Sequence, residues 1–190
     1  MKNDPQENSQ HHASGCPDPV GEEKQPTIPR ILILGVGNIL LSDEGAGIKA
    51  IQELQRQYSF PAEVELMDAG TSGMQLLPWI ENRSDLFILD IVNEQEADYG
   101  EVLQYNYEDP PAFVRKKSTS HQIGLHEVLA FSQMSNTLPS RIVLFGIRPL
   151  SFDTSLDLSP QVQEGLQKLI RMVIRELESS GISPIKKDDC

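Results

Sequence analysis

The sequence contains little cysteine and no long apolar run. Only two of its 190 residues are cysteines, and these, Cys16 and Cys190, lie near the ends of the chain, where they are poorly placed to staple a core or to bind a metal. The longest apolar stretch, residues 31–41, is interrupted by Asn38 and is too short to span a bilayer, and the N-terminus has no signal-peptide-like apolar segment. We therefore expect a soluble protein of a reducing compartment, the cytoplasm.

Basic residues are scarce as well. Lys and Arg number 16 against 28 Asp and Glu, which gives a formal net charge of -12, and residues 115–117 form the only run of three basic side chains. A charge of this sign repels nucleic acid and anionic membranes. Neither is expected as a partner.

Composition divides the chain into two parts. Residues 1–29 are rich in Pro, Gly, Ser, Asn, Gln and charge, and they carry too few apolar side chains to offset the entropy of ordering. Residues 30–190 are enough to bury one sizeable core. We predict a disordered N-terminal tail followed by a single α/β domain.

Apolar patterns in residues 30–190 alternate between those of strands and those of helices. The run at 86–92 has no polar alternation, which indicates a strand buried on both faces, and Ser159, Pro160 and Gly181 bracket the clearest helix. The predicted strands cover residues 31–36, about 64–66, 86–92, 101–107 at an edge, and 141–147; the predicted helices cover about 48–58, 72–82, 121–134 and 160–180. This order predicts a three-layer α/β sandwich, with a mostly parallel, twisted sheet of about five strands and helices on both faces.

Polar residues collect at the expected carboxyl ends of these strands, where ligands bind in such sheets. They are Asn38, Asp43 and Glu44 after the first strand, Asp68 at the end of the second, Asp90 near the end of the third, and His121 at the start of the helix before the last strand. The apolar neighbours of Asp90 make an ionised, unpartnered carboxylate costly there. A metal ion or a catalytic proton would satisfy it, and so would a helix cap or an arginine.

Each of these residues also has an ordinary structural explanation. Carboxylates such as Asp43 and Glu44 are stabilised in the first turn of a helix by its dipole and N–H groups. A histidine near a helix start, such as His121, is often a surface residue. Their convergence on one rim favours a site, because two carboxylates and an imidazole form a ligand set suited to a divalent transition ion.

A dinucleotide-binding fold is the main alternative. The Gly-Val-Gly motif at 35–37 follows a strand, and Asp68 stands where a ribose-binding acid belongs. However, the bulky Leu40 occupies the third glycine position, and the acids at 43–44 would face the pyrophosphate, where like charges roughly 4 Å apart repel by about 4 kcal/mol. The chain has no Walker loop, G-x-S-x-G elbow, H-E-x-x-H motif or paired C-x-x-C.

Five motifs, taken in order, resemble those of a known family. They are GVGNILLSDEGAG, DAGTSG, ILDIV, SHQIGLHEVL, and LFGIRP followed by LSP. The segment from Arg30 to about Ile182 is similar in this way to the nickel-iron hydrogenase maturation endopeptidases. It departs from the family at Ala69, which replaces a glycine of a DGGT-type motif.

The resemblance implies an endopeptidase domain that removes a C-terminal extension from the large-subunit precursor of a nickel-iron hydrogenase after nickel has been inserted. It implies that Glu44, Asp90 and His121 contact the metal, and that Asp68 acts in catalysis together with Glu44 and Asp90. Nickel would be supplied by the substrate, although zinc or cadmium could occupy the site in a crystal. The residues expected to hold the substrate peptide are Gly35, Gly37, Asn38, Gly70 and Thr71.

The reaction itself stays open at this point. Cleavage could use a metal-polarised carbonyl or a carboxylate-activated water. We expect a monomer whose partner is the hydrogenase precursor. Two other functions remain, a non-catalytic metal-dependent hydrogenase chaperone and the dinucleotide-binding protein described above.

Overall fold

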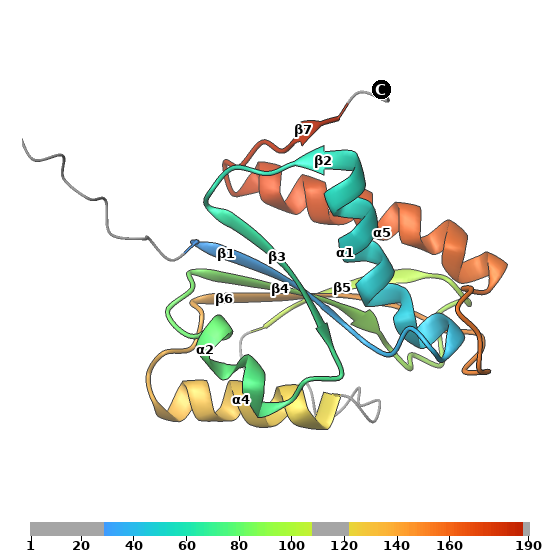
Figure 1. Ribbon diagram of the computed structural model, residues 1–190, viewed down its shortest axis with the longest axis horizontal. Helices are drawn as coiled ribbons and strands as arrows, with labels where there is room; N and C mark the ends of the chain where they lie inside the picture. Colours follow the sequence, from blue (N-terminus) through green and yellow to red (C-terminus); the bar gives the residue numbers. More distant parts are fainter. Residues whose placement is uncertain (1–28, 108–121, 188–190) are drawn as a thin grey trace, which may run out of the picture.

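A computed structural model describes residues 29–107 and 122–187, in which one five-stranded sheet lies between two layers of helices (Figure 1). The strands are β1 (Ile31–Val36), β3 (Val64–Gly70), β4 (Asp85–Ile91), β5 (Val102–Asn106) and β6 (Arg141–Ile147). Their order across the sheet is β3-β1-β4-β6-β5. All neighbours are parallel except β5, which runs antiparallel to β6 at one edge.

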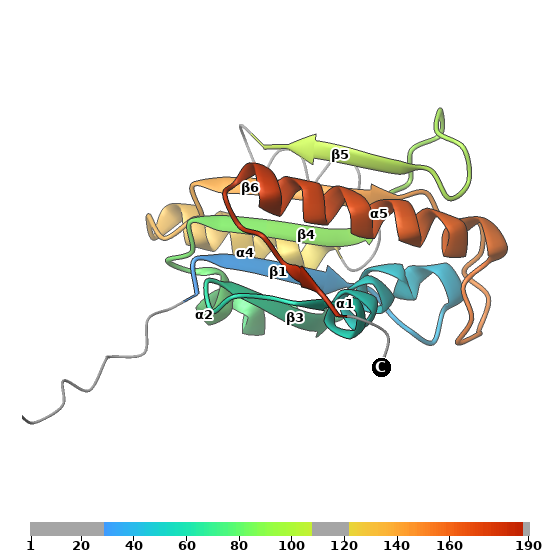
Figure 2. The same cartoon turned by 90° about the horizontal axis from the view of Figure 1, so that it is seen from above.

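Helices cover both faces of this sheet (Figure 2). One face carries α1 (Ala46–Gln57) and α5 (Pro160–Ser179), and the other carries α2 (Leu77–Ile80) and α4 (Gln122–Met134). Two short 3-10 helices, η1 (Ser42–Gly45) and η2 (Met74–Leu76), precede α1 and α2. A second sheet pairs β2 (Tyr58–Ser59) with β7 (Ile185–Lys186).

The core lies on both faces of the central strands. β1 and β4 are buried along their whole length, which confirms the prediction of a strand without polar alternation at 86–92. Beneath α1 and α5, the rings of Phe87 and Phe145 meet edge to face with 5.8 Å between their centroids. Because side chains alternate along a strand, Asp90 falls on the opposite face, the one that holds Ile88 and is covered by α4.

The connections of the sheet separate beside β1. The chain passes from β1 through α1 to β3 on one side, and then crosses through α2 to β4 on the other side of β1. In open α/β sheets, ligands bind at the carboxyl ends of the strands beside which the connections diverge, here β1 and β4. This position at the carboxyl ends of β1 and β4 is called the switch point below.

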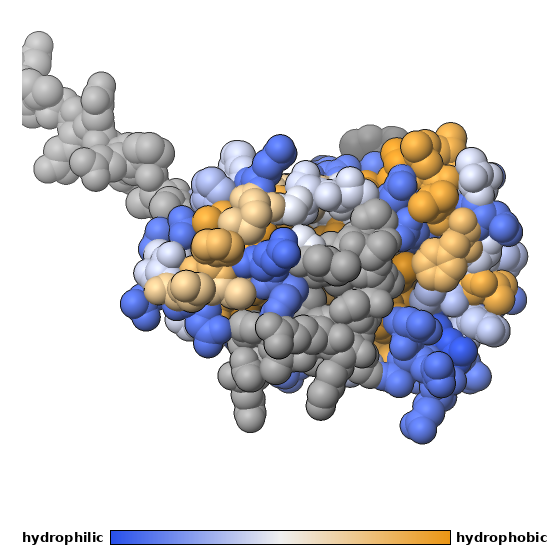
Figure 3. Space-filling view, turned by 90° about the horizontal axis from the view of Figure 1, so that it is seen from below, coloured by the Kyte–Doolittle hydropathy of each residue, from blue (hydrophilic) through white to orange (hydrophobic). Residues whose placement is uncertain are grey.

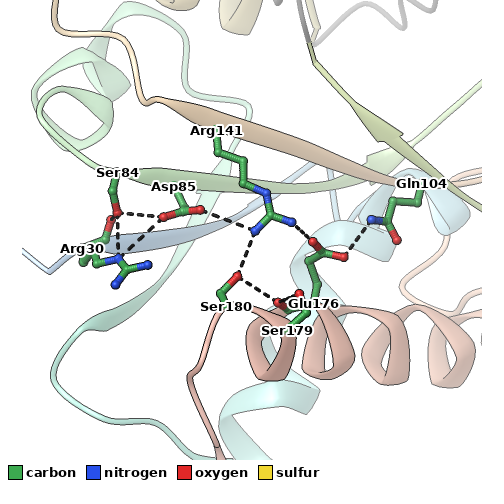
Figure 4. Close-up of polar contacts among 8 residues, drawn as sticks. All are labelled: Arg30, Ser84, Asp85, Gln104, Arg141, Glu176, Ser179 and Ser180. Atoms are coloured by element: carbon green, nitrogen blue, oxygen red, sulfur yellow. Dashed lines mark hydrogen bonds and ion pairs between the residues drawn. The ribbon is translucent and has the colours of Figure 1, made fainter.

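The amino end of the sheet is closed by a network of paired charges (Figure 4). Asp85 lies 3.8 Å from the guanidinium of Arg30 and 3.6 Å from that of Arg141. Arg141 also pairs with Glu176 of α5 and donates to Ser180 Oγ at 2.9 Å. The network ties the starts of β4 and β6 to the last turns of α5.

The predicted α/β fold is confirmed, with differences in three short segments. The helix predicted at 72–82 is much shorter, because Pro78 has no N–H to bond the preceding turn and the chain becomes extended at Glu81. Tyr58, expected on the first helix, follows it in β2, and the β2–β7 pairing is not predicted at all. The predicted tail falls almost wholly outside the described residues.

Candidate functional site

Glycines let the start of α1 pack directly on the strand ends, and this brings Glu44 to the switch point. A Cβ at Gly47 would collide with the carbonyl oxygens of Leu89 and Val36, at the ends of β4 and β1. Gly37 has φ +137°, and a Cβ there would collide with the carbonyl oxygen of Glu44. The Glu44 side chain is only 4% exposed in this arrangement.

Asp43 has a different role from its neighbour. Its carboxylate is fully buried and accepts hydrogen bonds from Leu150 N (2.8 Å), Ser151 N (2.8 Å), Ser159 N (2.7 Å) and Ser159 Oγ (2.9 Å). Asp43 therefore fixes the loop at 148–159 and the start of α5. Because these four donors hold the Asp43 carboxylate inside the protein, Glu44 is the acid that would repel a pyrophosphate bound at this loop.

Asp90 lies at the end of β4 and is 1% exposed. Its Oδ1 accepts from Ile91 N at 2.7 Å. The predicted burial of this carboxylate among apolar side chains is confirmed. Since β4 and η1 are in contact, the structure brings two carboxylates from separate parts of the chain, Glu44 and Asp90, to the same end of the sheet.

Tyr107, which the sequence did not single out, is influenced by the charge of Asp90 although its backbone lies beside the start of β6. It follows β5 and continues the pairing with β6 through its N–H, which donates to Ile142 O at 3.1 Å. Burial raises the pKa of its phenol, and so does the nearby negative charge of Asp90. The phenol therefore stays protonated at neutral pH. Its only signal in the sequence is its place at the end of a predicted edge strand.

The end of β3 carries the third carboxylate. Asp68 is exposed on the edge strand, and its Oδ1 accepts from Gly70 N at 2.9 Å. The carbonyl of Gly70 in turn accepts from Gly37 N at 2.9 Å, which ties the end of β3 to the loop after β1. Thr71 is exposed beyond it. Asp68, Gly70 and Thr71 thus border the switch point from the β3 side.

The remaining predicted contacts to substrate differ in accessibility. Gly35 is buried inside β1, where a Cβ would meet the backbone of Gly47, and Gly37 is buried as well. Asn38 is half-buried; its Oδ1 accepts from Leu40 N at 3.0 Å, and its N–H donates to Glu44 O at 3.2 Å. Asn38 therefore holds the turn that leads to Glu44.

The first turn of α4 meets the loop after β3. A Cβ at Gly124 would lie 2.9 Å from the Cα of Gly73, so these two segments are in close contact near the carboxyl end of the sheet. His121 directly precedes α4 and lies outside the described residues. Within residues 29–107 and 122–187, no three His, Cys, Asp or Glu side chains form a group that could hold a metal. The predicted ligand set of Glu44, Asp90 and His121 thus stays a prediction.

Comparison with known proteins identifies the family. The family described as hydrogenase maturation protease matches residues 48–176. The chain belongs to the hydrogenase maturation protease family. The Hydrogenase 2 maturation protease of Escherichia coli (strain K12) is 35% identical over 159 residues, which cover 84% of this chain and 97% of that protein. The hydrogenase expression/formation protein HupD of Rhodobacter capsulatus is 35% identical over 159 residues, which cover 83% of this chain and 75% of that protein.

Solved structures agree with this result. The hydrogenase maturating endopeptidase HybD from E. coli superposes with a TM-score of 0.80 at 35% sequence identity, and the match covers 85% of this chain and 99% of that chain. The predicted family, the α/β fold and the class of enzyme, an endopeptidase, are confirmed. Among the described helices, none has the length and apolar character needed to cross a membrane.

Proposed function

We propose that this endopeptidase removes a C-terminal extension from the large-subunit precursor of a nickel-iron hydrogenase and recognises the nickel ion already bound in that precursor. The observation that carries the proposal is the burial of two carboxylates, Glu44 and Asp90, which come from different segments, η1 and β4, that are in contact at the carboxyl end of the sheet. Nickel enters as part of the substrate. The protein needs no metal of its own.

The electrostatics of this pair favour a cation over a phosphate. Carboxylate oxygens from two segments at one end of the sheet are donors that suit a divalent ion. A dinucleotide would add negative charge beside Glu44, and the exposed Leu40 stands in the loop where a phosphate-binding glycine is needed. A divalent ion lowers the energy of both carboxylates at once.

His121 completes the proposed ligand set. Imidazole nitrogen and carboxylate oxygen are both ligands that nickel accepts. His121 precedes α4, whose first turn meets the loop after β3 at the same end of the sheet. With three ligands from the enzyme, the other positions on the ion stay with the precursor's own cysteine thiolates. Nickel then acts as a checkpoint, because a nickel-free precursor lacks the ion that these three residues coordinate.

The cleavage step adds water across one peptide bond. The water oxygen bonds to the carbonyl carbon, a base takes its proton, and the departing amine receives a proton as the C–N bond breaks. We assign the base to Asp68, which is exposed on the edge of the sheet. In the other route, nickel polarises the carbonyl and no carboxylate base is needed. Asp68→Asn separates the two, since a full kcat in this variant would exclude the carboxylate route.

The substrate peptide is proposed to pass beside the loops after β1 and β3. Asn38, Gly70 and Thr71 are the accessible members of the predicted set, whereas Gly35 and Gly37 are buried and act by shaping the first loop. In this arrangement the scissile bond lies between the nickel ligands and Asp68.

The decisive experiment compares nickel-loaded and nickel-free precursor. We expect mass spectrometry to show a shortened precursor only when nickel is present. Equal cleavage of both forms would remove the checkpoint from the proposal. Binding without any shortening would instead indicate the chaperone, and thermal stabilisation by a dinucleotide would indicate the nucleotide-binding protein.

We further propose that the enzyme acts in the cytoplasm as a monomer. The net charge of -12 favours a soluble protein that avoids nucleic acid and anionic lipid. Light scattering coupled to gel filtration measures the mass directly. A dimer at micromolar concentration would contradict the monomer.

A further inference from the structure

Two loops at the carboxyl end of the sheet expose an unusual share of the apolar surface. The described residues contain eleven exposed large apolar side chains, and five of them lie on these two loops. These five, called the apolar platform below, are Ile39, Leu40, Leu150, Phe152 and Leu156, with exposures of 40%, 57%, 42%, 51% and 60%. The other six are distributed over five separate parts of the chain.

The backbone under the apolar platform is held in one conformation. Leu41 pairs with Ser155 in a parallel bridge, Ser155 N donates to Leu40 O at 3.1 Å, and Ser42 N donates to Ser155 O at 2.9 Å. Ser42 Oγ also donates to Asp157 O at 2.9 Å, and the buried Asp43 carboxylate binds the same loop from inside. Apolar side chains on a fixed backbone lose little further entropy when a partner covers them.

The apolar platform adjoins the candidate site. The loop that carries Ile39 and Leu40 on its outside continues directly into η1 and Glu44. Figure 1 shows this loop and the segment between β6 and α5 at the same end of the molecule, where the strands end. Figure 3 shows apolar side chains gathered at that end. A substrate held at Glu44 is therefore held next to the apolar platform.

Exposed acids lie among the platform residues in sequence. Asp153 and Asp157 are both exposed in the loop that carries Phe152 and Leu156. Contiguous exposed apolar surface with a polar rim is typical of protein-binding sites. Acids at these positions would complement basic residues around the apolar centre of a partner's surface.

We propose that the apolar platform is the docking surface for the folded part of the hydrogenase large-subunit precursor. It contacts an apolar, basic-rimmed surface of that protein beside its bound nickel. The proposal rests on the proposed function and adds to it a contact that does not involve the metal. In this proposal, the nickel ion marks a precursor in which metal insertion is complete, and the apolar platform determines which protein is bound.

The test removes two platform side chains that belong to neither hydrophobic core cluster. In the platform variant, Leu40→Ser and Phe152→Ser are combined. The matched control combines Phe131→Ser with Met134→Ser, which removes two side chains of 50% and 79% exposure from the last turns of α4, away from the site. Titration calorimetry with nickel-free precursor measures docking apart from the metal contact, and steady-state cleavage of nickel-loaded precursor gives KM and kcat.

We expect the platform variant to raise both Kd and KM by about tenfold or more, with kcat within about twofold of wild type. The control variant should have the same Kd, KM and kcat as wild type. Equal binding by the platform variant and wild type would overturn the proposal, and so would an equal loss in the control. If sedimentation shows that the platform variant loses only self-association, the surface is a dimer contact and the proposal is again overturned.

These outcomes separate docking from cleavage. If wild-type enzyme leaves the nickel-loaded precursor uncut, the proposed function fails, while the calorimetric comparison of the two variants still decides the docking proposal. If cleavage is normal and the platform variant binds normally, only the docking proposal fails.

Discussion

The two ends of the central sheet hold their charged side chains in different ways. At the amino end, Asp85 lies between two arginines, and Arg141 links it to Glu176 of α5 (Figure 4). At the carboxyl end, the buried carboxylate of Asp43 is held by backbone N–H groups and one hydroxyl instead of by a cation. Glu44 and Asp90 are buried at the same end.

This difference assigns the two ends different roles: the amino end stabilises the fold, and the carboxyl end holds the candidate site. A carboxylate already matched by arginines has little to offer a ligand, and the amino end therefore serves to join β4, β6 and α5. At the carboxyl end, backbone donors hold Asp43, and glycine contacts place the turn that carries Glu44. The carboxyl end is therefore the one that the proposed function assigns to the nickel ion carried by the substrate.

The largest expected effect comes from removing the carboxylate that organises the carboxyl end. Asp43→Ala leaves three backbone N–H groups and a hydroxyl inside the protein without their acceptor. We expect the free energy of unfolding to fall by about 3–4 kcal/mol, measured by urea denaturation, with loss of processing. The free energy of unfolding of Asp43→Asn should lie between those of Asp43→Ala and wild type.

Asp153→Asn is the matched control for Asp43. It removes an exposed acid from the same loop, and we expect a change within about 0.5 kcal/mol. If the two substitutions cost the same, the buried carboxylate does not organise this end.

The next effect concerns activity. Glu44→Gln and Asp90→Asn keep the shape of each side chain and remove its charge. We expect kcat/KM for nickel-loaded precursor to fall by about 100-fold or more, which corresponds to about 2.7 kcal/mol, while the unfolding free energy is unchanged or slightly higher. Glu96→Gln, an exposed acid at the same end, is the control and should be fully active. Full activity of both site variants would end the proposed role of the pair.

A smaller effect is expected from the glycine that positions Glu44. Gly37→Ala places a Cβ against the carbonyl oxygen of Glu44 at φ +137°, and we expect a loss of about 2 kcal/mol in unfolding free energy. Gly181→Ala is the comparison, since Gly181 has φ +80° and no atom within 4 Å of its added Cβ. Its loss should be about 1 kcal/mol, without change in processing. Equal processing by the two variants would show that Gly37 does not position Glu44.

The smallest effect belongs to the amino end. Arg141→Met removes the guanidinium that joins Asp85 to Glu176, and its side chain is 39% exposed, so solvent screens much of the interaction. We expect a loss of about 1 kcal/mol that shrinks in about 1 M salt, and normal kcat/KM. A large fall in kcat/KM with an unchanged free energy of unfolding would show that the amino end also takes part in activity, which contradicts the different roles assigned to the two ends.

The sequence predicted the parts of the site that depend on local pattern. Asp90 stands out because a carboxylate interrupts an apolar strand near its end, and Glu44 because it follows a glycine-containing turn after a strand. The role of Asp43 could not be predicted, since its partners lie more than a hundred residues further along the chain and are backbone groups. Tyr107 was missed for a similar reason: its nearness to Asp90 depends on the order of strands.

The same reasoning applies to the fold. Strands β1, β4 and β6 and helix α5 were predicted because each buries a continuous or periodic apolar set. The pairing of β2 with β7 was not predicted, because two-residue strands are too short to show a period. The helix expected at 72–82 is interrupted on both sides of α2: Pro78 in its first turn has no N–H to donate to the preceding turn, which is a 3-10 helix, and the chain becomes extended at Glu81. Side-chain periodicity does not report these backbone effects.

The hydrogen bonds that Asp43 accepts from the loop at 148–159 also affect how the substrate specificity of such an enzyme can change. The loop is held by the Asp43 side chain, which is buried. The side chains of Leu40, Phe152 and the other platform residues are exposed and take no part in these hydrogen bonds. Replacing the platform side chains therefore leaves Glu44 where it is. Under the docking proposal, the exchange of a few surface side chains redirects the enzyme to a different hydrogenase while the buried carboxylates keep their positions.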